Sequence, residues 1–197
     1  MIAGIIFDLD GTLADSQLDF EAMRAEMELP PGQPILESLA HLPPDRAVHC
    51  REILHRHELE GAARATLLPG VAELFAVIER RGWRMAIATR NSREITALTL
   101  KKLGLSVELA MTRDDGPVKP DPWAVHHVCQ QWGVSPADVV VIGDYKFDIE
   151  SGRAAGTRTV LLTHPHDPRH YPNHEQADLL LTSLAEYPRL LAWLESL

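Results

Sequence analysis

The sequence predicts an α/β protein with a parallel β-sheet, helices on both faces of that sheet, and a small all-helical segment inserted after the first strand. Short, branched apolar runs alternate with stretches of helical periodicity, which is the pattern of successive strand–helix units. Between residues 15 and 68 only helical patterns occur, and prolines divide them. We therefore expect a core formed by residues 1–14 and 69–197 and a helical insertion formed by residues 15–68.

The first strand is expected at residues 2–7, a short and branched apolar run followed by a glycine break at Gly11. The insertion is expected to hold three helices. The first places Leu18, Phe20, Met23 and Met27 on one face, the second spans residues 35–42, and the third starts near Asp45 with an apolar stripe of Val48, Cys50, Ile53 and Leu54.

The remaining chain alternates between helices and strands. Glycines end several of the helices, and the pair Asn91 and Glu94 is a capping pattern for one of them. We expect helices near residues 71–81, 91–103, 121–132, 149–155 and 184–194, and strands near 85–88, 107–111, 139–142, 159–162 and 179–180.

Composition narrows the class of protein. The 197 residues suffice for one well-buried domain plus a small insertion, and 45% hydrophobic with 24% charged residues is typical of soluble globular proteins. A formal charge of −9 argues against a nucleic-acid or membrane surface. Cys50 and Cys129 stand alone, which predicts reduced, buried thiols and a cytoplasmic location. Asp8 and Asp10 interrupt the N-terminal apolar run, so it is not a signal peptide.

Two carboxylates stand at the end of the first expected strand. Side chains alternate along a strand, so Asp8 and Asp10 can point the same way, and Gly11 lets the backbone turn away after them. Two neighbouring acids are costly unless positive charge lies between them. A hard divalent cation with a bound phosphate would supply that charge.

Three further elements should lie at the same edge of the sheet. Thr89 ends the 85–88 strand, Lys119 precedes a helix, and Asp144 follows the 139–142 strand, with Asp148 four residues later. The carboxyl ends of parallel strands form the ligand-binding edge of an open α/β sheet. A hydroxyl, an ammonium group and further carboxylates are therefore expected beside the N-terminal acids.

The string Asp-Leu-Asp-Gly-Thr-Leu at residues 8–13, together with the order and spacing of Thr89, Lys119 and Asp144, resembles the haloacid dehalogenase superfamily of phosphatases. The resemblance covers nearly the whole chain and is greatest to the phosphoglycolate-phosphatase-like branch. It implies a Rossmann-like core, a helical cap that helps to choose the substrate, and magnesium-dependent hydrolysis of a small phosphorylated metabolite. The insertion is short for the family, which leaves cap closure open.

The resemblance also implies roles for individual residues. Asp8 would be the nucleophile that forms an aspartyl phosphate, and Asp10 the general acid and base. Mg²⁺ would be held by Asp8, by the backbone carbonyl of Asp10 and by Asp144.

The phosphate would be bound by Thr89, by backbone N–H groups near Asn91 and by Lys119, with Asp148 orienting Lys119 or holding a metal-bound water. Many relatives have asparagine directly after the threonine, whereas here Arg90 comes first. Arg90 either reaches a substrate anion or is a surface arginine.

Two other features remain open in the sequence. Lys146 stands where relatives have smaller residues, and it either forms a local ion pair or reaches the mouth of the site. The histidine-rich segment at residues 164–174 is interpreted as a solvated, proline-stiffened loop, because its histidines lack metal-ligand spacing.

Two alternative functions also remain: a phosphomutase of the same superfamily, and a non-catalytic phosphate-binding or partner-binding module. A dehalogenase is disfavoured because such enzymes lack the second carboxylate, here Asp10. The particular phosphate ester and the oligomeric state do not follow from the sequence.

Overall fold

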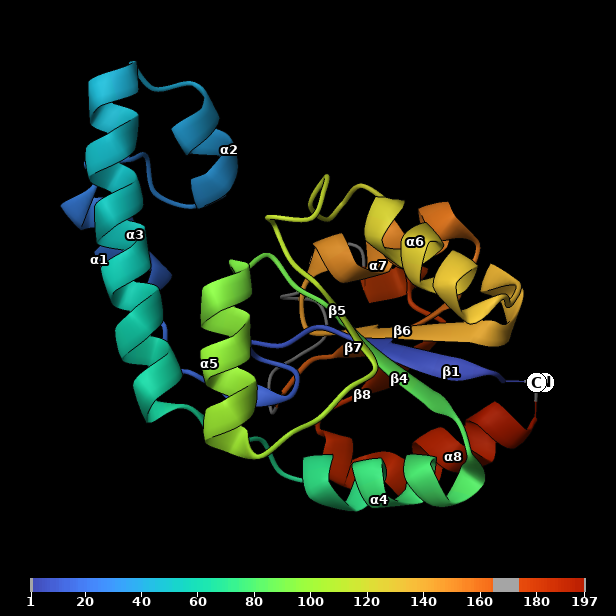
Figure 1. Ribbon diagram of the computed structural model, residues 1–197. Coiled ribbons are helices and arrows are strands. Elements are labelled where there is room, and N and C mark those ends of the chain that lie inside the picture. The colour runs from blue at the N-terminus through green and yellow to red at the C-terminus, as the bar shows by residue number, and fades with distance from the viewer. Residues whose placement is uncertain (1, 165–173, 197) are drawn as a thin grey trace.

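The computed structural model describes residues 2–164 and 174–196, and its centre is a six-stranded parallel sheet (Figure 1). The strand order is β5-β4-β1-β6-β7-β8. These strands are β1 (Gly4–Phe7), β4 (Arg84–Ala88), β5 (Leu109–Met111), β6 (Val139–Gly143), β7 (Arg158–Leu162) and β8 (Leu179–Leu181). The predicted fold class is confirmed, and the first strand of the chain lies in the middle of the sheet.

Helices cover both faces of the sheet (Figure 1). Helices α4 (Val71–Arg81) and α8 (Tyr187–Glu195) lie below the sheet in that view, and α6 (Trp123–Trp132) and α7 (Lys146–Ala155) lie above it. Helix α5 (Arg93–Leu103) packs Leu100 and Leu103 against the same apolar cluster as α4 and α8. Left-handed glycines end four of these helices, namely Gly82, Gly104, Gly133 and Gly156.

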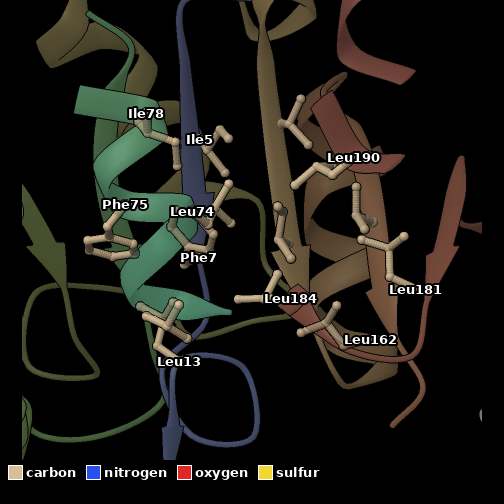
Figure 2. Close-up of a cluster of buried hydrophobic side chains, with 14 of the residues drawn as sticks. Ile5, Phe7, Leu13, Leu74, Phe75, Ile78, Leu162, Leu181, Leu184 and Leu190 are labelled. Atoms are coloured by element: carbon tan, nitrogen blue, oxygen red, sulfur yellow. The ribbon is translucent and has the colours of Figure 1, made fainter. Parts of the chain in front are cut away.

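The larger apolar cluster fills the space between the sheet and helices α4 and α8 (Figure 2). Ile5 and Phe7 of β1 point into it, and the rings of Phe7 and Phe75 are 5.6 Å apart. On the opposite face, Ile6 and Val141 pack with α6 and α7. Burial on both sides explains why these strands read as continuous apolar runs.

The helical insertion lies beside the sheet and forms an apolar cluster of its own (Figure 1). It contains α1 (Phe20–Glu26), α2 (Ile35–Ala40) and α3 (Pro44–Arg64), of which α3 packs along α5. Where the chain leaves and re-enters the core, β2 (Ala14–Asp15) pairs antiparallel with β3 (Thr66–Leu67). The sequence does not predict this pair, because two residues are too few to produce a periodic signal.

Two residues that the sequence placed on the apolar faces of insertion helices are largely exposed. Phe20 is 49% and Val48 54% exposed. Each lies on a helix whose buried face is built by other residues, such as Met23 on α1 and Cys50 on α3. A single apolar residue on a helix does not define its buried face when the stripe is narrow.

The predicted cap of α5 is also wrong by one residue. Ser92 is the N-cap, and its hydroxyl accepts a hydrogen bond from the backbone N–H of Ile95. Asn91 directs its amide elsewhere, as described below. The remaining helices and strands of the sequence analysis occur close to the expected positions.

Other expectations concern thiols, membranes and the histidine-rich segment. Cys50 and Cys129 are free and buried, as predicted. Within residues 2–164 and 174–196, none of the helices is long and apolar enough to cross a membrane. Most of the histidine-rich segment, residues 165–173, lies outside the described residues.

Candidate active site

Three polar side chains follow the ends of three adjacent strands. Asp8 follows β1, Thr89 follows β4 and Asp144 follows β6. The strands are in register, since Phe7 pairs with Ile87 on one side and with Ile142 on the other. The parallel sheet therefore brings these three residues to one edge, as the sequence predicts.

Lys119 joins two of the carboxylates at this edge. Its Nζ donates to Asp8 Oδ1 at 2.6 Å and to Asp148 Oδ1 at 2.5 Å. Lys119 is 4% exposed and Asp148 2% exposed. Burial alone would lower the pKa of Lys119, but the charges of Asp148 and Asp8 outweigh it and the pKa is raised. The ammonium group is therefore permanently charged at neutral pH.

Asp8, Asp144 and Asp148 form a cluster of acids, with one oxygen of each lying within 4.8 Å of the others. Burial, followed by repulsion from Asp8 and Asp148, raises the pKa of Asp144 well above its ordinary value. Burial also raises the pKa of Asp148 to about 6, although Lys119 acts in the opposite direction. One lysine does not neutralise three acids, so the cluster has the charge and the oxygen donors that Mg²⁺ requires.

Two glycines permit this close approach of acids. Gly11 has φ +78°, and a Cβ atom there would lie 2.2 Å from Asp144 Oδ2. At Gly143 a Cβ atom would lie 2.1 Å from Asp148 Cγ. Any larger residue at either position would displace a carboxylate of the cluster.

Asp10 lies in the same site but has different partners. Its Oδ2 accepts a hydrogen bond of 2.5 Å from Asn91 Nδ2. Burial is the main cause that raises the pKa of Asp10 from 3.8 to about 6, and the charge of Asp8 adds to it. Hydrogen bonds from Ser16 and Asn91 oppose the shift. A carboxyl group with such a pKa can both give and take a proton near neutral pH.

Arg90, whose role the sequence left open, connects the core to the helical insertion. Its Nη2 donates to both carboxylate oxygens of Glu37, at 2.8 and 2.7 Å, and its Nη1 donates to the carbonyl of Lys119. The guanidinium also stacks over the ring of Phe147, 4.8 Å from the centroid. Lys146, also left open, lies over the rings of Tyr145 and Phe147.

A second ion pair between core and insertion was not predicted. Arg113 donates to both oxygens of Glu58, at 2.5 and 2.8 Å, and Glu58 is only 5% exposed. Two sequence signals were available: Arg113 follows the end of β5, and Glu58 interrupts the buried stripe of α3 four residues after Leu54. A charged residue within a buried stripe indicates a partner of opposite charge.

A cavity of about 510 Å³ opens between the strand ends and the insertion. Asp8, Asp10, Thr89, Lys119 and Asp144 line one end of it. Residues of α1, α2 and α3 and of the loops beside them line the other end. Every site residue proposed from the sequence contributes to this cavity, namely Asp8, Asp10, Thr89, Arg90, Asn91, Lys119, Asp144 and Asp148.

A parallel sheet that ends in clustered acids, a buried lysine and an enclosing helical segment defines an enzyme that acts on phosphate groups. The chain belongs to the haloacid dehalogenase-like hydrolase family, whose model matches residues 22–156. It is a phosphatase, in agreement with the prediction.

Relatives agree with this assignment. The chain is 30% identical to N-acetylmuramic acid 6-phosphate phosphatase of Pseudomonas aeruginosa, over 96% of this chain and 93% of that one. It is 29% identical to a plasmid-encoded phosphoglycolate phosphatase of Cupriavidus necator, over 95% and 92% of the two chains. The crystal structure of a hydrolase from Pseudomonas syringae shares the fold, with a TM-score of 0.80, 23% identity and coverage of 97% and 98%.

Proposed function

We propose that this protein is a magnesium-dependent phosphatase that hydrolyses a small phosphate monoester through an aspartyl phosphate on Asp8. The observation that carries the proposal is the bridge from Lys119 to Asp8 and Asp148 beside Asp144. Such a bridge holds a carboxylate in one orientation next to positive charge, which a nucleophile facing an anionic phosphate needs. A non-catalytic phosphate-binding module would leave the two acids Asp8 and Asp10 at the strand end without a role.

The first step transfers the phosphoryl group to Asp8. A carboxylate oxygen of Asp8 forms a bond to phosphorus while the bond from phosphorus to the ester oxygen breaks. Asp10, whose pKa of about 6 keeps part of it protonated near neutral pH, gives its proton to the departing alcohol. Lys119 and the Thr89 hydroxyl hold the phosphate oxygens.

The second step hydrolyses the aspartyl phosphate. Asp10, now ionised, takes a proton from water, whose oxygen attacks phosphorus and releases Asp8 and inorganic phosphate. Asn91 keeps Asp10 directed into the site through the 2.5 Å hydrogen bond. The same two residues therefore act in both steps, with the proton on Asp10 restored at the end.

The acid cluster fits Mg²⁺. Asp8 and Asp144, with the backbone carbonyl of Asp10, would hold the ion, and Asp148 would support it through Lys119 or a water. When bound, Mg²⁺ neutralises repulsion between Asp8 and the phosphate oxygens. Burial first, and then the charges of Asp8 and Asp148, raise the pKa of Asp144, so its carboxylate would lose its proton more readily beside a bound cation.

We further propose that residues 15–68 act as a cap on a core of residues 1–14 and 69–197. The cavity between strand ends and α1–α3 supports this division. So does the β2–β3 pair, which places both crossings of the chain side by side.

The test is phosphate release from an aryl phosphate with Mg²⁺, followed by chemical trapping of the intermediate. When the reaction is quenched rapidly with a substrate that carries radioactive phosphorus, the protein should carry the labelled phosphoryl group. Hydroxylamine should then remove this label, because it cleaves acyl phosphates. Asp8→Asn should abolish both signals and keep the circular dichroism spectrum, whereas Asp45→Asn, an exposed change on α3, should keep both signals. Turnover by the Asp8→Asn enzyme at the parental rate would refute the assignment. Release of a rearranged phosphate ester in place of inorganic phosphate would indicate a mutase.

A further inference from the structure

The cavity wall remote from the phosphate end carries its arginines already paired with acids. Among the described residues, four cations line the cavity, and Lys119 belongs to the phosphate end. Arg90 is held by both oxygens of Glu37, and Arg113 by both oxygens of Glu58. Arg113 uses both terminal nitrogens, which is the bidentate geometry by which arginine binds anionic ligands. Arg90 uses Nη2 for both oxygens of Glu37 and Nη1 for the carbonyl of Lys119.

Arg24 is the remaining cation of this wall. Its Nη1 donates to the carbonyl of Phe20 at 3.1 Å, and its Nη2 lies 3.3 Å from Glu21. Its Nε is buried without an acceptor. Each arginine of the wall thus has a glutamate beside it, so the wall offers little net positive charge to a second anionic group.

The rest of the wall is apolar and aromatic. Leu18, Phe20, Ile35 and Leu36 line it from the insertion, and Tyr145 and Phe147 line it from the core. Phe20 is 49% exposed and Tyr145 45% exposed, and such unburied aromatic rings can pack against the apolar face of a ligand ring. The volume of about 510 Å³ lies within the ~300–1,000 Å³ range of pockets that bind ring-sized ligands.

We propose that the preferred substrate is a phosphate monoester of an uncharged, ring-sized alcohol, such as a neutral sugar, and that esters with a second anionic group are disfavoured. This inference deepens the proposed function and rests on it. A carboxylate placed beyond the phosphate would meet arginines already neutralised by Glu37 and Glu58. Its desolvation would therefore be poorly compensated.

Two matched substrate pairs isolate the effect of one carboxylate. N-acetylglucosamine 6-phosphate and N-acetylmuramic acid 6-phosphate differ by a lactyl ether that carries the carboxylate. The pair 2-hydroxyethyl phosphate and phosphoglycolate differs by a hydroxymethyl group in place of a carboxylate. We expect kcat/KM to favour the uncharged member of each pair by at least about 10-fold. The kcat/KM for N-acetylglucosamine 6-phosphate should also exceed that for 2-hydroxyethyl phosphate.

A variant that frees an arginine gives a sharper readout. Glu37→Gln removes the charge that neutralises Arg90. The ratio of kcat/KM for the uncharged substrate to kcat/KM for the anionic one should therefore fall by at least about 3-fold in both pairs. Glu26→Gln is the matched control, because Glu26 is as exposed as Glu37 (43%) and pairs with Arg56, which, unlike Arg90, does not line the cavity. It should leave both ratios unchanged.

Arg24→Met tests whether Arg24 binds a second anionic group of the substrate. If Arg24 did so, the variant would lose phosphoglycolate hydrolysis selectively. We expect the variant instead to affect the hydrolysis of all four substrates alike. A parental preference for the anionic member of either pair, or unchanged ratios in Glu37→Gln, would overturn this inference. Hydrolysis of an aryl phosphate that depends on Asp8 would then still support the proposed function. Failure to hydrolyse any phosphate would overturn both.

Discussion

Asp10 shows how a single residue of the site lowers the stability of the protein. Its pKa is raised by burial from 3.8 to about 6, so the folded chain binds its proton more tightly than the unfolded chain does. Because of this group, the free energy of unfolding falls as pH rises from about 4 to about 6, and the decrease stays constant above that range. In the mechanism that we propose, the ionised carboxylate is needed in the second step, which would explain why this cost is retained.

We therefore expect Asp10→Asn to be inactive but more stable than the parent at pH 7.5. A shift of about two pKa units corresponds to a gain of up to about 3 kcal/mol, and the gain should vanish at pH 3.5. Urea unfolding in EDTA at both pH values measures it. Asp45→Asn, which changes an exposed carboxylate, should show no such gain. A gain that was equal at both pH values would instead indicate a packing effect.

At the scale of elements, α3 takes part in two ion pairs of unequal burial, one with the core and one within the insertion. Arg113 and Glu58 join the end of β5 to α3 with side chains 19% and 5% exposed. Arg56 and Glu26 join α3 to α1 on the surface, where both side chains are nearly half exposed. Removing one partner of a buried pair lowers the free energy of unfolding far more than removing one partner of a surface pair, because the remaining charge stays buried.

A double-mutant cycle tests this difference. Glu58→Leu and Arg113→Met should each destabilise the protein by about 3 kcal/mol, and the double variant should recover most of that loss. The corresponding cycle on Glu26 and Arg56 should give a coupling below about 1 kcal/mol. Midpoints of urea unfolding supply the values. Additive losses at Glu58 and Arg113 would show that the two side chains act independently.

These ion pairs also show what the sequence could and could not reveal. Periodicity and glycine positions predicted nearly every element of the core, because each depends on neighbours within a few residues. The strand-end acids were predicted because parallel strands place their carboxyl ends together. Glu37 and Glu58 pair with arginines more than 50 residues away, and no local pattern records such a distance. The exposed Phe20 was misplaced for the same reason, because its environment is set by the cavity and not by α1 alone.

At the scale of the whole molecule, we expect the acid cluster to link folding stability to divalent cations. Asp144 must lose its proton to bind a cation, and its pKa is raised by burial and by neighbouring acids. We expect Mg²⁺ to raise the melting temperature more at pH 8 than at pH 5, because protons compete for the same oxygens. Differential scanning fluorimetry with MgCl₂ against EDTA measures the effect.

Asp144→Asn is the variant for this test, since it keeps the size of the side chain but removes the charge that the cation requires. It should lose most of the Mg²⁺-dependent shift at both pH values. Equal shifts at pH 5 and pH 8 in the parent would place the cation away from Asp144.

The central position of β1 affects how the protein is made. This strand leaves the ribosome before both of its sheet neighbours, which begin only at Arg84 and Val139. The nascent chain must therefore carry an unpaired, apolar strand at least until β4 has been made, and such segments favour aggregation and chaperone binding. The helical insertion, whose apolar cluster uses only residues 18–54, lies within the part of the chain that is made while β1 still waits for its partners.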